Sequence, residues 1–117
     1  MEGRRKERVA ELIRQQLGQM LVKDVRDPSL REVTFTEVRV SPDLSVAQVF
    51  FAAHDDTGAE QARRGLERAA PFFRRELSRL LKLRRTPELR FRRDEVLDQG
   101  EHIDTILREL GQVGDES

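Results

Sequence analysis

With 117 residues, of which 37% are hydrophobic and 38% are charged, the chain has the size of one domain with a modest core. It contains no cysteine, which excludes disulfides and thiolate metal sites, and no apolar run of signal-peptide or membrane-spanning length, so we expect a cytoplasmic protein. The net charge is zero, but residues 1–62 carry −2, residues 63–93 carry +9 and residues 94–117 carry −7.

The first predicted element is a helix over residues 4–23. Its apolar side chains recur at i, i+3 and i+4 and therefore share one face, which consists of Val9, Leu12, Ile13, Leu17, Met20 and Leu21. The sequence Asp27-Pro28-Ser29 predicts the turn after this helix, because the residue before a proline disfavours helical backbone.

Two strands are predicted next, over residues 33–40 and 46–53, because both segments are rich in β-branched and apolar residues. The turn signal Ser41-Pro42-Asp43 between them favours an antiparallel hairpin. In the first strand the apolar parity changes between Phe35 and Val38, which predicts either a bulge or a strand buried on both faces.

The sequence Thr57-Gly58-Ala59-Glu60 matches a capping box and predicts a second helix that runs to about Ala70. Pro71 is expected to break or kink the helical pattern before a third helix over residues 72–83. One half of that helix is apolar (Phe72, Phe73, Leu77, Leu80, Leu81 and Leu83), and the other is cationic (Arg74, Arg75, Arg79 and Lys82).

The last strand of the domain is predicted over residues 88–93, where Leu89, Phe91 and Arg93 alternate with Glu88, Arg90 and Arg92, so that the solvent side of the strand is basic. Beyond residue 94 an acidic extension, residues 95–117, is expected to hold a short amphipathic helix marked by Ile103, Ile106, Leu107 and Leu110, followed by a disordered end. The element order predicts an α+β domain, in which helices cover one face of a three-stranded sheet.

Four segments in this order resemble the ribosome-binding factor A family of bacterial small-subunit assembly factors. They are R-V-A-E-L-I (8–13), D-P-S-L (27–30), V-R-V-S-P-D-L-S-V-A-Q-V-F-F (38–51) and L-R-R-T-P-E-L-R-F-R-R-D (83–94). The resemblance implies a type II KH-like domain over residues 1–94. It also implies a protein that binds small-subunit ribosomal RNA near the decoding region and assists late maturation, including processing of the 5′ end of that RNA.

One segment departs from the pattern of related domains. Ordinary KH domains bring nucleic acid to a G-x-x-G loop between two helices. The family resembled here typically has an alanine-any-glycine kink at that place, and the aligned residues of this chain are Ala69-Ala70-Pro71. Proline preserves a kink but removes a point where the backbone approaches RNA closely, so the contact is expected at neighbouring arginines.

The segment 63–93 holds 12 basic and three acidic residues, and 19 of the 22 basic residues of the chain are arginine, which contacts phosphate bidentately and stacks on bases. Genome composition or heat adaptation would also enrich arginine. A solvated charged face is the alternative, but the segment is expected to lack balancing i, i+4 partners, which favours RNA. The candidate RNA-binding residues are Arg64, Arg68, Arg75, Arg79, Lys82, Arg84, Arg85, Arg90, Arg92 and Arg93, with Arg4, Arg5, Lys6 and Arg8, for which a solvated face is equally consistent.

Other residue types favour structural roles. Most of the six phenylalanines are expected in the core, although aromatic rings also serve as stacking platforms for bases. His54 and His102 have no ligand-spaced neighbours, and the acidic run after residue 93 lacks the spacing of a calcium loop, so we expect neither metal nor cofactor.

No phosphate loop and no nucleophile with a base is recognisable, so we expect a monomeric binding protein and not an enzyme. Two alternatives stay open. The first is a protein–protein adaptor that docks its basic face on an acidic partner, and the second is a small nuclease with metal-binding carboxylates near the arginines.

Overall fold

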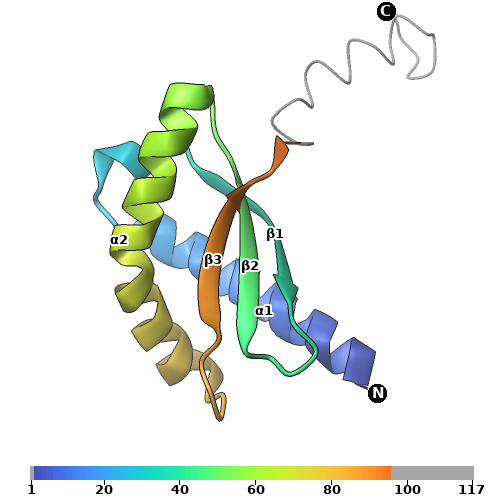
Figure 1. Cartoon of the computed structure of the whole chain (residues 1–117). Coiled ribbons are helices and arrows are strands. Elements are labelled where there is room, and N and C mark those ends of the chain that lie inside the picture. Colours follow the sequence, from blue (N-terminus) through green and yellow to red (C-terminus); the bar gives the residue numbers. More distant parts are fainter. Residues whose placement is uncertain (1, 96–117) are drawn as a thin grey trace, which may run out of the picture.

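The computed structural model describes residues 2–95, and the predicted C-terminal helix and acidic end lie outside them. Side chains are described from Arg5 onward. The elements in chain order are α1 (Glu2–Lys23), a short 3-10 helix η1 (Pro28–Leu30), β1 (Thr34–Val40), β2 (Val46–Ala52), α2 (Asp56–Leu81) and β3 (Glu88–Arg93) (Figure 1).

The sheet has the order β1-β2-β3, with β2 in the centre. The hairpin pair β1 and β2 is antiparallel, whereas β2 and β3 are parallel, so α2 serves as the crossover connection that parallel strands require. Both helices lie on the same side of the sheet, and the other side is open (Figure 1). The predicted α+β architecture is therefore confirmed.

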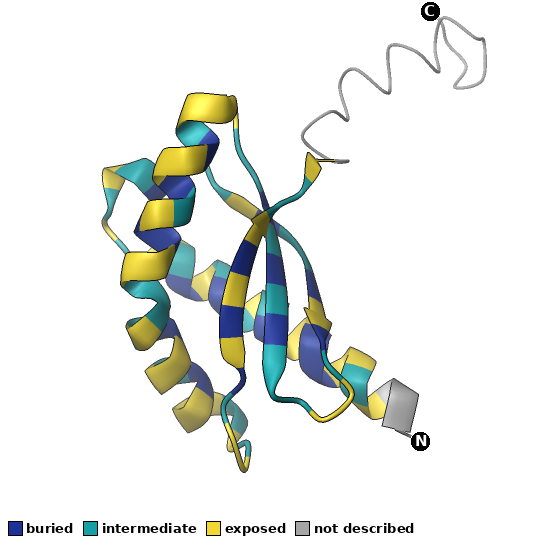
Figure 2. Cartoon of the chain, viewed as in Figure 1, coloured by how far each residue is buried: buried dark blue, intermediate teal, exposed yellow. Residues whose placement is uncertain are grey.

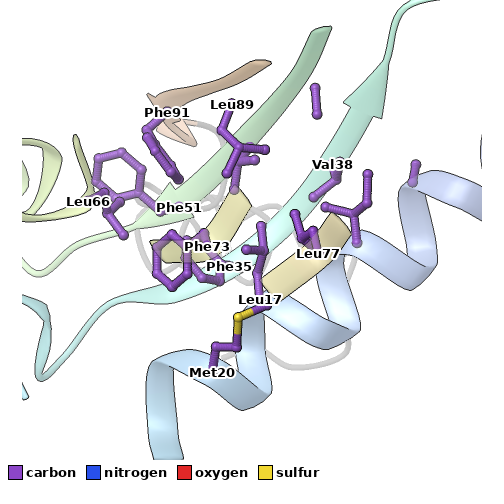
Figure 3. Close-up of a cluster of buried hydrophobic side chains, with 14 of the residues drawn as sticks. Leu17, Met20, Phe35, Val38, Phe51, Leu66, Phe73, Leu77, Leu89 and Phe91 are labelled. Carbon is purple, nitrogen blue, oxygen red and sulfur yellow. The ribbon is translucent and has the colours of Figure 1, made fainter. Parts of the chain in front are cut away.

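The core lies between the sheet and the two helices (Figure 3). Along β2 every second residue is buried, which gives the banded pattern of Figure 2. The register of β1 against β2 shifts between Phe35 and Glu37, so Thr36 is the extra residue of a β-bulge. Because of this bulge Phe35 and Val38 both face the core, which confirms the bulge as the cause of the parity change.

The start of α2 differs from the prediction. The N-cap is Asp55, whose Oδ1 accepts a hydrogen bond from the Gly58 N–H at 2.7 Å, and the helix begins at Asp56. Thr57 therefore lies inside the first turn, and the predicted capping box is wrong. Its Glu60 instead accepts hydrogen bonds from Arg63 and Arg64.

The predicted second and third helices form one continuous helix, α2, with Pro71 inside it. The ribbon of α2 changes direction about halfway along its length (Figure 1), as expected where a proline removes one helical hydrogen bond. Pro71 is exposed, so water can satisfy the carbonyl group left without a donor. Of the predicted apolar half, Phe73 and Leu77 are fully buried, whereas Leu80 is exposed.

Candidate nucleic-acid interface

Three arginines that are distant in the sequence line one hollow at an end of the molecule. Arg5 comes from α1, and Arg84 and Arg85 come from the connection between α2 and β3. The hollow has a volume of about 480 Å³ and is completed by Asp43, Leu44 and Leu83. Figure 1 shows the start of α1, the hairpin loop and the α2–β3 connection at this same end. We call Arg5, Lys82, Arg84 and Arg85 the basic pole.

The side chains of the basic pole are exposed, and none of them forms an ion pair with another of the described side chains, those of residues 5–95. A guanidinium group donates bidentately to phosphate oxygens. These groups can therefore bind an anion without giving up an intramolecular partner within that part of the chain.

The hairpin loop beside the basic pole is held by its own side chains. Asp43 Oδ1 accepts hydrogen bonds from the hydroxyl groups of Ser45 at 2.7 Å and Ser41 at 2.8 Å, and from the Ser45 N–H at 3.1 Å. These bonds, led by that of the Ser45 hydroxyl, lower the pKa of Asp43 to about 2. The Asp43 charge is thus engaged within the loop, although it lies in the hollow.

The α2–β3 connection is also anchored. The Arg74 guanidinium donates to the carbonyl oxygens of Pro87 and Thr86, both at 3.1 Å, and Pro87 is fully buried. Among the described residues the only non-glycine positions with positive φ are Leu44, at 62°, and Lys82, at 51°. Such backbone costs energy and is often found at functional sites, and here both positions belong to the segments that build the hollow.

A second group of predicted RNA-binding arginines is occupied by carboxylates. Arg64 pairs with Glu60 at 3.1 Å, Arg68 with Asp27 at 2.8 Å, Arg79 with Glu76 at 2.7 Å and Arg90 with Glu88 at 3.1 Å. Arg63 pairs with both Glu60 and Glu67 at 2.7 Å. The expectation that this segment lacks balancing i, i+4 partners is wrong. The spacing of Glu60 and Glu67 around Arg63 could have revealed it.

The remaining candidates fall into three classes. Lys6, Arg8 and Arg92 form no ion pair with the described residues, and the Arg75 guanidinium lies 5.9 Å from the centre of the Phe72 ring. Arg93 donates to Asp56 at 2.6 Å. The side chain of Arg4 is outside the described set.

At the predicted kink, Ala69 and Ala70 pack against the core, whereas Pro71 is exposed.

The phenylalanines are divided between two faces of the sheet. Phe35, Phe73 and Phe91 form a cluster of rings 6.3–6.5 Å apart in the core, together with buried Phe51. Phe50 is the exception to the predicted core role, because it is half-buried on the open face and does not pack against the core. Its place follows from strand parity, since adjacent residues of a strand point to opposite faces.

Neither a metal site nor a membrane span is found among residues 2–95. That part of the chain contains no group of three or more His, Cys, Asp or Glu side chains suited to a metal ion. Neither of its helices is long and apolar enough to cross a membrane. His54 is exposed, and His102 lies outside the described residues.

Comparison with known proteins gives one consistent result. The family model described as ribosome-binding factor A matches residues 5–107. The ribosome-binding factor A of Enterococcus faecalis is 40% identical over 114 residues, which cover 96% of this chain and 98% of that protein. The crystal structure of ribosome-binding factor A from Thermus thermophilus superposes with a TM-score of 0.68 and 31% identity, over 75% of this chain and 94% of the other.

A second solved structure shows the Thermus thermophilus factor in its complex. It is a homology model fitted into a cryo-EM map of a 30S–RbfA complex, and it is 30% identical to this chain with a TM-score of 0.62. The match covers 75% of this chain and 93% of the fitted one.

Proposed function

This chain belongs to the ribosome-binding factor A family, and from that premise we propose that it binds the small ribosomal subunit through its ribosomal RNA. The relative fitted into the 30S map supports the subunit as the partner. RNA as the contacted component is supported by the net charge of +9 on residues 63–93.

The observation that carries the proposal is the hollow of the basic pole. It brings Arg5 together with Arg84 and Arg85, and these three groups lack carboxylate partners among the side chains of residues 5–95. An RNA phosphate supplies the negative charge that they lack. The anchored loops on both sides hold the arginines near one another before RNA arrives, which reduces the entropy lost on binding.

The proposed mechanism is binding without catalysis. The protein docks on the RNA of an immature small subunit, holds an immature conformation or blocks its early use, and leaves when maturation is complete. Assistance to 5′-end processing of the RNA is then indirect, because the bound protein keeps the precursor in a form that processing enzymes recognise. No chemical step on the RNA is assigned to this chain.

The salt dependence of binding tests the electrostatic part of the proposal. Affinity for free small subunits should fall with a log–log slope of roughly −0.7 to −0.9 for each phosphate contact. The protein should sediment with free small subunits and not with whole ribosomes, which would distinguish an assembly factor from a resident ribosomal protein. A flat salt response, with binding unaffected by competing RNA, would instead favour an adaptor that docks on a protein.

A further inference from the structure

The open face of the sheet carries an aromatic ring at its centre. Phe50 lies on β2, the central strand, and its neighbours Val49 and Phe51 are buried on the opposite face. No described helix covers the open face (Figures 1 and 2). Phe50 is not packed against the hydrophobic core. Core packing therefore does not explain a large apolar side chain at this position.

The groups around the Phe50 ring are those that bind a planar ligand. The Arg39 guanidinium lies 5.2 Å from the ring centre, and the Glu37 carboxylate holds it there by accepting hydrogen bonds from its Nε at 2.7 Å and its Nη2 at 3.3 Å. On the neighbouring strand β3, Arg92 is the register partner of Phe50. Arg92 is exposed and has no ion-pair partner among the described side chains of residues 5–95.

Phe50, Arg39 and Arg92 help to line a hollow of about 740 Å³ that contains both arginines and carboxylates. Three of its carboxylates already have arginine partners, since Glu37 pairs with Arg39, Asp56 with Arg93 and Glu60 with Arg63. The mixed charge does not suit a cluster of phosphates. It suits a flat, uncharged and polar ligand, because aromatic and guanidinium planes stack on it and carboxylates accept hydrogen bonds from its amino groups.

We propose that Phe50 and Arg39 stack on an unpaired nucleobase of RNA, while Arg92 contacts the adjoining phosphate. The proposal rests on the RNA binding proposed above and adds a base-binding site to the phosphate-binding pole. The two sites are separate hollows that share no lining residue. β2 begins at Val46, beside the loop of the basic pole, and Phe50 is four residues further on, about 13 Å along the strand. One RNA strand can therefore reach both.

Two labelled oligomers distinguish the base site from the phosphate site. One is a single-stranded oligouridylate of about 12 nucleotides, and the other is an abasic ribose-phosphate oligomer of the same length. Binding to the full chain is followed by fluorescence anisotropy. Phe50→Leu should weaken binding of the oligouridylate at least about fivefold and leave the abasic oligomer unchanged. Phe50→Tyr should retain the affinity, because its ring still stacks.

The matched control is Gln48→Ala, which alters the same strand on the same face without removing a ring. It should bind both oligomers like the unchanged protein. Equal losses for both oligomers with Phe50→Leu, or no loss for either, would overturn the base site while leaving the phosphate site in place. Failure of the unchanged protein to bind either oligomer would overturn the proposed RNA binding itself.

A spectroscopic test uses the absence of tryptophan from the sequence. In the Phe50→Trp variant the single indole reports on the open face. Oligouridylate should quench its fluorescence, and the abasic oligomer should not. If the free protein already shows the emission of a buried indole, and RNA does not change it, protein covers this face and the base site is wrong.

Discussion

Two arginine-rich regions of this molecule look alike in the sequence and differ in the structure. In the first half of α2, Arg63, Arg64 and Arg68 all form ion pairs, and we call these three residues the paired cluster. At the basic pole, Arg84 and Arg85 form none with the described side chains of residues 5–95. A count of basic residues predicts RNA binding at both regions. The positions of the carboxylates show that only the arginines of the basic pole are unpaired among the described side chains.

The difference decides at which region an RNA phosphate gains more binding free energy. At the paired cluster the phosphate competes with Glu60, Glu67 and Asp27, whose charges already offset much of the local positive potential. At the basic pole the carboxylate that lines the hollow, Asp43, accepts hydrogen bonds from its own loop. Exposed ion pairs add little to stability. The main consequence of the pairing is therefore that these guanidinium groups are less available to bind an anionic ligand.

The sharpest test removes two charges from each region in turn. Replacement of both Arg84 and Arg85 by Gln should lower the affinity for small-subunit RNA on the order of 100-fold, because two charge-assisted contacts to phosphate are lost. The log–log salt slope should become shallower by about 1.4. Thermal unfolding should hardly change, since both side chains are exposed and unpaired within residues 2–95.

The matched control is the double change Arg63→Gln and Arg64→Gln, which alters the net charge by the same amount. It should lower the affinity less than about threefold, because those groups already have carboxylate partners. Equal losses in the two variants would mean that net charge alone governs binding. The comparison between the regions would then carry no functional meaning.

A glycine-to-alanine change tests the packing that supports the paired cluster. A Cβ atom on Gly65 would collide with the Ser29 hydroxyl and lie 3.1 Å from Leu30 Cδ2, so α2 approaches η1 closely at this point. Gly65→Ala should destabilise the fold by about 1–2 kcal/mol in urea unfolding, because overpacking outweighs the helix propensity of alanine. Gly18→Ala is the control, because a Cβ there meets nothing within 4 Å and should not destabilise α1. Equal effects at the two glycines would contradict the close approach.

The ion pair between α2 and η1 predicts a dependence on pH. The Arg68 guanidinium, and after it the Ser29 side chain, lower the pKa of Asp27 from 3.8 to about 2. A lowered folded-state pKa stabilises the fold above 3.8, and this contribution is lost as the pH falls through about 2. Asp27→Asn should therefore be less stable than the unchanged protein at neutral pH, and the difference should shrink across that window. A difference independent of pH would show that the carboxylate charge is not what stabilises this contact.

Periodicity predicted most of the fold, because the core faces of α1 and of the strands follow from spacing alone. The parity change between Phe35 and Val38 even revealed the bulge at Thr36. The predicted start of α2 is wrong because Asp55, two residues before Thr57, caps the helix with its carboxylate in place of the Thr57 hydroxyl. The local signal of Pro71 indicated two helices, whereas packing of Phe73 and Leu77 on the sheet keeps one helix continuous.

The candidate site was less accessible from the sequence than the fold. Arg5 and Arg85 are 80 positions apart, and only the folded chain shows that they line one hollow. Arg68 and its partner Asp27 are 41 positions apart, and their pairing also leaves no local signal in the sequence. By contrast, Glu60 and Arg64 have the spacing of a helical ion pair, so this part of the occupied surface was predictable from the sequence.

The smallest expected effect comes from removing the carboxylate partner of one arginine in the paired cluster, Arg64. Glu60 accepts hydrogen bonds from Arg63 and Arg64, whose guanidinium groups lower its pKa, so it stays ionised at neutral pH. Glu60→Gln removes that charge and leaves Arg64 without its carboxylate. RNA affinity should rise about two- to threefold, with a slightly steeper salt slope, because one more cation can contact phosphate. The control is Glu7→Gln on the exposed surface of α1. It removes the same unit of negative charge, but Glu7 forms no ion pair with an arginine among the described side chains of residues 5–95. A larger increase in RNA affinity for Glu60→Gln than for Glu7→Gln therefore measures the effect of pairing. If the two variants gain equally, the increase reflects net charge, and the carboxylates of α2 do not restrict where RNA binds.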